Sequence, residues 1–122
     1  MDDKNKERTY IISLSYIEDL LSECEEQIEN TKYLISEFIN NERYPKDNYY
    51  LFPISEILFC NLTMVYFVDT SIDLTSPIKN KETGEDEILL SEKTAQLLQS
   101  MALSRYYANV SLNKLSYSVS SH

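Results

Sequence analysis

The fold is decided above all by residues 10–38, YIISLSYIEDLLSECEEQIENTKYLISEF. Apolar side chains recur there at alternating gaps of four and three residues, and no proline or glycine interrupts them before Pro45. This 3.5-residue period is typical of a helix that packs along one line of contact. The recurring positions are Tyr10, Leu14, Ile17, Leu21, Cys24, Ile28, Thr31, Ile35 and Phe38. We therefore predict one long helix over residues 10–41, preceded by a frayed lead-in over residues 1–9.

A second helix is predicted over residues 54–76. Two prolines and an Asp-Asn pair in residues 41–53 indicate a connection, and Pro53 suits the first turn of a following helix. Nearly every residue from Ile57 to Val68 is apolar, which favours a helix buried on all sides. Because many of these residues are β-branched or aromatic, a central strand is the alternative.

A third helix is predicted over residues 91–117, before a polar tail over residues 118–122. Residues 78–87 are the most polar stretch and are expected to form a loop, after which Ser91 has the right character for a helix N-cap. Three long helices in one domain predict an all-α fold, an antiparallel three-helix bundle. A second copy of the chain would cover the all-round apolar second helix, so the sequence favours a homodimer, with the long first helix as the expected contact.

The composition argues against an enzyme. The 122 residues contain one glycine, Gly84, so the glycine-rich loops that hold phosphates are excluded. The one histidine is His122, the last residue, which removes the usual catalytic base and the usual zinc ligand. We therefore predict no catalytic activity, no cofactor and no metal site.

One short stretch resembles a known family. Residues 104–108, Ser-Arg-Tyr-Tyr-Ala, are similar to a segment of the HEPN helical domains, which include ribonucleases. The resemblance covers five residues, and the family's Arg-x4–6-His motif has no counterpart because no histidine follows Arg105 before His122. The resemblance therefore implies no catalytic residue here.

Charge and hydropathy suggest where the protein acts. Twenty acidic residues against eleven basic ones give a net charge of −9, which disfavours direct binding to nucleic acid or anionic lipid. The charged N-terminus lacks the apolar stretch of a signal peptide, and the run Ile57–Val68 is shorter than the ~20 residues of a membrane span. We expect a cytoplasmic protein, in its own cell or in a host cell, with Cys24 and Cys60 as buried free thiols.

The strongest local signal is a run of acidic residues without a neighbouring base. Its members are Glu18, Asp19, Glu23, Glu25, Glu26 and Glu29. Pairs of like charge four residues apart cost a helix a few tenths of a kcal/mol. The run is therefore either a solvated outer face or a docking face for a basic protein partner. Tyr44, Tyr49 and Tyr50 crowd the next connection, where they would anchor a partner or cap the bundle.

Arg105 is the second candidate, because it lies among apolar and aromatic neighbours. One interpretation is an internal ion pair with Asp69 or Asp73 on the second helix. A second is a site for an anionic metabolite or nucleotide, formed by Arg105, Tyr106 and Tyr107, and a third is simple exposure to solvent.

Together these features favour a small, acidic, non-enzymatic protein-binding module. It would act as an inhibitor or adaptor that docks on a basic surface, of the kind common among phage, virus and plasmid products. The alternative is a helical protein that binds a small anionic ligand through Arg105 and the neighbouring tyrosines.

Overall fold

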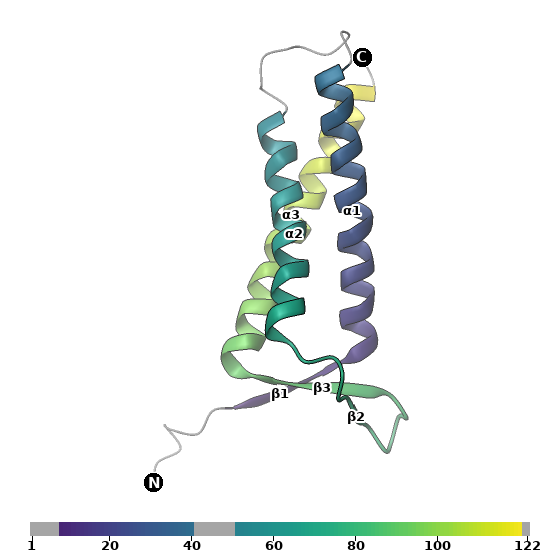
Figure 1. Cartoon of the computed structure of the whole chain (residues 1–122), viewed down its shortest axis with the longest axis vertical. Helices are drawn as coiled ribbons and strands as arrows, with labels where there is room; N and C mark the ends of the chain where they lie inside the picture. The colour runs from purple at the N-terminus through teal and green to yellow at the C-terminus, as the bar shows by residue number, and fades with distance from the viewer. Residues whose placement is uncertain (1–7, 41–50, 121–122) are drawn as a thin grey trace.

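The computed structural model describes residues 8–40 and 51–120, which form three long helices and three short strands (Figure 1). In chain order the elements are β1 (Thr9–Ser13), α1 (Leu14–Asn40), α2 (Leu51–Ser71), β2 (Ile78–Lys79), β3 (Asp86–Ser91) and α3 (Glu92–Ser120). α1 and α3 run in the same direction, and α2 runs in the opposite direction and packs against both. The three predicted helices are present, so the strand alternative for residues 54–76 is wrong.

The prediction of an all-α fold is also wrong, because an antiparallel sheet lies across one end of the bundle (Figure 1). The strand order is β1-β3-β2. β1 pairs with β3 over its whole length, from Thr9 opposite Ser91 to Ser13 opposite Glu87. β1 continues directly into α1, and β3 continues directly into α3. The sheet therefore ties the starts of two helices together.

Neither of the two longer strands, β1 and β3, was predicted as a strand. Residues 10–13, expected in the first helix, form β1, so α1 begins at Leu14. In β3, Ile88 and Leu90 are buried whereas Leu89 between them is exposed. This alternation is the period of a strand with one buried face. β3 was not predicted because it is short and begins with two acidic residues.

The polar stretch before β3 is an ordered hairpin. The Asn80 side-chain oxygen accepts hydrogen bonds from the backbone N–H groups of Glu82 (2.9 Å) and Thr83 (3.2 Å). The Gly84 N–H donates to the Asn80 carbonyl oxygen over 2.7 Å, and Gly84 has a φ of 75°, a conformation that glycine adopts without strain. The turn returns the chain so that β2 pairs with the start of β3.

The core lies where the sheet meets the three helices. From Ile17 to Phe38, the positions of the 3.5-residue pattern are buried or half-buried, which confirms that part of the prediction. β3 closes the end of the core with its two buried side chains. The core cluster comprises Ile17, Leu20, Cys24, Met64, Val68, Ile72, Ile88, Leu90 and Leu98.

Helix ends differ from the predicted ones by a few residues. α2 covers Leu51–Ser71 instead of residues 54–76, with Pro53 in its first turn as expected. The predicted cap of α3 is confirmed, because the Ser91 hydroxyl accepts a hydrogen bond from the Thr94 N–H over 3.2 Å. α3 then continues to Ser120, past the predicted end at residue 117.

Candidate functional site

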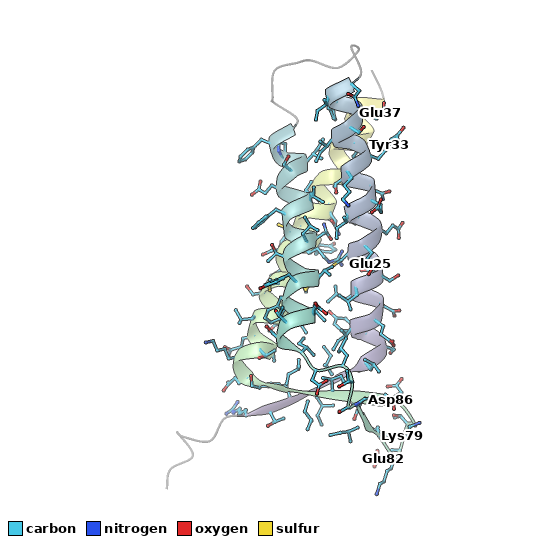
Figure 2. All side chains as sticks on the ribbon, viewed as in Figure 1. Glu25, Tyr33, Glu37, Lys79, Glu82 and Asp86 are labelled. Atoms are coloured by element: carbon cyan, nitrogen blue, oxygen red, sulfur yellow. The ribbon has the colours of Figure 1, made fainter. Side chains whose placement is uncertain are left out.

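Five acidic side chains form one exposed face of α1. At 100° per residue these five positions fall within about one third of the helix circumference, on the side opposite the buried residues. Carboxylates project from the side of α1 turned away from α2, with Glu25 about midway along the helix (Figure 2). We call Glu18, Asp19, Glu25, Glu26 and Glu29 the acidic face.

Basic residues barely offset this charge. Lys32 is the one Lys or Arg within α1, and its ammonium lies 3.7 Å from the carboxylate of Glu29. Both side chains are well exposed, and such surface pairs contribute little to stability. The acidic face therefore keeps most of its negative charge.

Glu23, the sixth acidic candidate, does not belong to this face. Its carboxylate accepts a hydrogen bond from the Arg105 guanidinium of α3 over 2.9 Å. Arg105 is only 9% exposed, whereas the Glu23 side chain is 62% exposed. The structure therefore has the internal ion pair that one interpretation of Arg105 predicted.

The predicted partners of that ion pair, Asp69 on α2 and Asp73 just after its end, were wrong, because Arg105 pairs with Glu23 on α1. Asp69 is exposed, and the carboxylate of Asp73 accepts hydrogen bonds from the backbone N–H and the hydroxyl of Thr75. These two hydrogen bonds lower the pKa of Asp73. The sequence therefore predicted that an acidic residue pairs with Arg105, but it did not identify Glu23 as that residue.

A small polar layer lies one helical turn beyond the ion pair. The Asn61 amide of α2 donates to the Ile57 carbonyl oxygen over 2.9 Å and to the Asn109 side-chain oxygen of α3 over 3.4 Å. Asn61 is fully buried, and buried polar groups of this kind are costly unless they are hydrogen-bonded. Within the described chain, three buried side-chain atoms have no hydrogen-bond partner, namely Gln27 Oε1, Asn61 Oδ1 and Arg105 Nε.

An open groove of about 660 Å³ runs between β1, the first turn of α1, and α3. Among the described residues, none with a charged side chain lines it. Its walls include large side chains that are substantially exposed: Tyr10, Ile11, Tyr16, Leu103 and Tyr106. We call it the apolar groove. Sequence analysis did not identify it, because β1 was expected to be helix.

The remaining aromatic candidates are not gathered into one site. Tyr44, Tyr49 and Tyr50 lie outside the described residues. Tyr106 and Tyr107 are both exposed and meet edge to face, with ring centroids 5.7 Å apart. Tyr106 lines the apolar groove, but Arg105 beside it does not, since its guanidinium is turned towards Glu23.

Both cysteines are free thiols. Cys24 is buried in the core, and Cys60 is half-buried between α2 and α3. Burial raises the pKa of both thiols. Over residues 8–40 and 51–120, no three His, Cys, Asp or Glu side chains converge as a metal-ligand set.

Comparison with known proteins adds no relative to this picture. No protein-family model matches the chain, and no curated protein or solved structure is significantly similar to it.

Proposed function

We propose that the protein is a non-enzymatic docking module that binds a protein partner with a basic surface, as an inhibitor or adaptor. The observation that carries the proposal is the acidic face of α1, with five exposed carboxylates and one basic neighbour. Like charges at this spacing destabilise a helix slightly. A face that only had to be soluble would gain stability from interspersed lysines.

The apolar groove supplies a second part of the binding surface. Tyr16 lines the groove and lies one turn before Asp19 of the acidic face, so the two surfaces adjoin. In protein interfaces, charges speed the encounter and select the partner, whereas buried aromatic and aliphatic anchors carry most of the affinity. A basic partner with one apolar side chain at its centre would match both surfaces.

The contacts of Arg105 support protein docking over the small-ligand alternative. A guanidinium that recognises a free anion must be able to reach it, but that of Arg105 is largely buried and already bonded to a carboxylate. An entering anion would have to displace Glu23 and would meet its negative charge.

Charge reversal on the acidic face tests the proposal. The double variant Glu25→Lys/Glu26→Lys should lose a partner that the wild type captures from lysate of the source cells. The matched control Glu82→Lys/Glu85→Lys changes the net charge equally in the β2–β3 hairpin (Figure 2) and should retain that partner. Quantitative mass spectrometry of the three captures gives the comparison.

The interaction should then be reproduced with the purified partner by calorimetry at two salt concentrations. Affinity should fall as salt rises, because exposed charges are screened. The proposal is refuted if both double variants capture the same proteins as the wild type, or if both lose them equally.

A further inference from the structure

The outer side of α2 carries an uncovered row of aromatic side chains. Phe52, Phe59 and Tyr66 are 74%, 67% and 70% exposed, and they follow one another at intervals of seven residues. Leu62, partly exposed, lies between the last two. At this spacing all four lie along one side of the helix, as in a helix–helix seam. We call these four residues the aromatic stripe.

The opposite side of α2 belongs to the protein's own core. Ile54, Ile57, Met64 and Val68 are all buried there. Segment Phe52–Ser71 is long and apolar enough to span a membrane, yet only 28% of it is buried. A soluble protein rarely leaves such a continuous apolar surface bare unless another surface covers it.

We propose that the aromatic stripe is the contact of a homodimer, in which α2 packs antiparallel against α2 of a second copy. The even spacing makes the stripe self-complementary about a twofold axis at Phe59. In that arrangement Phe59 faces the partner copy's Phe59, and Phe52 faces the partner copy's Tyr66. Aromatic side chains in such contacts add stability beyond the area they bury.

The area of the stripe, if fully covered, just meets the lower limit for a dimer interface. A phenylalanine or tyrosine side chain buries about 200 Å² when fully covered, so three of them at about 70% exposure supply roughly 400 Å². Leu62 and the flanking atoms bring each copy to about 500 Å². The total of about 1,000 Å² reaches the lower limit for specific protein interfaces.

Charge favours α2 over the helix that the sequence pattern suggested as the dimer contact. α2 carries two acidic residues, Glu56 and Asp69, whereas the outer side of α1 carries the whole acidic face. Two copies joined through α1 would bring ten carboxylates together, with Lys32 of each copy as the one basic residue of its helix. Joined through α2, the two acidic faces remain in solvent.

The residues that flank the aromatic stripe disfavour a lipid bilayer as the surface that covers it. Ser55, Glu56, Thr63 and Asp69 border the stripe, so the apolar surface is narrow. A bilayer-spanning α2 would have to leave α1 and α3, and the core would be lost. A second copy covers the stripe without disturbing the fold.

Sedimentation velocity tests the dimer directly. The wild type should sediment at twice its chain mass of 14.3 kDa, and Phe59→Glu should sediment at the single chain mass with unchanged helical circular dichroism. Leu97→Glu places the same charge on an exposed apolar position of α3 outside the apolar groove and should remain dimeric. A monomeric wild type, or a dimer that Phe59→Glu leaves intact, overturns the proposal.

Crosslinking tests the register. In a Cys60→Ser background, Phe59→Cys should form covalent dimers with a short bismaleimide, because the two substituted positions face each other. Tyr66→Cys should not, because its two copies would lie about 21 Å apart along the helices at 1.5 Å per residue. Efficient linking through residue 66 without linking through residue 59 contradicts the antiparallel arrangement.

Lipid is the remaining outcome. A wild type that is monomeric in buffer and co-sediments with phosphatidylcholine vesicles, while Phe59→Glu does not, assigns the stripe to a membrane surface and refutes the dimer. None of these measurements involves the acidic face. The dimer and the proposed docking function can therefore fail independently.

Discussion

Replacing Glu23 by alanine should destabilise the fold by about 2 kcal/mol. The change leaves the Arg105 guanidinium, whose side chain is 11% exposed, without the carboxylate 2.9 Å away. Exposed ion pairs contribute about 0.2–1 kcal/mol, and removing one partner of a fully buried pair costs about 3–5 kcal/mol. Because Glu23 itself is 62% exposed, its loss falls between these limits, close to the value for a hydrogen bond to a charged group.

Arg105→Met should cost less, about 1 kcal/mol. Methionine retains the apolar stem of the arginine, and the remaining Glu23 carboxylate is solvated. Removing the exposed partner, Glu23, should therefore lower the free energy of unfolding more than removing the buried partner, Arg105.

Urea unfolding of the two single variants and the double variant measures this asymmetry. Glu23→Ala should also lower Tm by about 8 °C, at about 4 °C per kcal/mol for a chain of this size. Glu23→Gln should recover part of the loss, because its amide oxygen still accepts the hydrogen bond, and Glu18→Ala is the control on an exposed carboxylate. The reasoning is refuted if Glu23→Ala costs less than about 0.5 kcal/mol while Arg105→Met costs more than about 3 kcal/mol.

Three further outcomes follow from features described above. Glu25→Lys should stabilise the monomer fold by about 0.2–0.5 kcal/mol in urea unfolding while it weakens partner binding, because it replaces like-charge contacts along α1 by attractive ones; a stability loss would contradict this. In native protein at pH 8, Cys24 should react with iodoacetamide much more slowly than Cys60, because Cys24 is buried in the core whereas Cys60 is half-buried; peptide mass spectrometry over time measures both rates, and equal rates would argue against the core position. Ser91→Ala should cost about 1 kcal/mol in thermal unfolding, because it removes the cap of α3, and Ser91→Thr should retain most of that stability.

Much of the helical architecture could be predicted, because long periodic patterns carry strong signals. From Ile17 to Phe38 the predicted positions of α1 are buried or half-buried, although Leu20 is buried more completely than the predicted Leu21. The sheet could not be predicted in the same way. Tyr10 lies four residues before Leu14 and continues the helical spacing, and the strand-favouring types at residues 10–12 are too few to outweigh that pattern. Their strand conformation depends on pairing with β3, which follows only after α1 and α2 in the chain.

The candidate site residues could be identified from the sequence, but their contacts in the folded protein could not. The acidic run on the first helix was evident, yet only the ion pair with Arg105 of α3 separates Glu23 from the acidic face. An internal ion pair of Arg105 was also predicted, but with Asp69 or Asp73 instead of Glu23. Long-range contacts of this kind depend on how the helices are arranged in space. The spacing of charges along one helix does not contain that information.

The two proposed surfaces lie on different helices, and this has a consequence for binding. A dimer joined through α2 would present two acidic faces at once. A partner that is itself a dimer, or that has two basic sites, would then bind with an effective affinity well above that of one face. Phe59→Glu would abolish this gain without touching a contact residue of the acidic face.

The pairing of β1 with β3 also has a consequence for how the chain is made. On a ribosome, residues 9–13 emerge early, but their strand partner, residues 87–91, emerges only after α1 and α2 have been synthesised. Contacts between such distant segments close late because the intervening chain must first be ordered. Until then, the core residues of α1 and α2 that pack against β3 remain uncovered. Pulse-labelled hydrogen exchange should find the amides of β1 protected after those of α1, which would make the sheet the final step of folding.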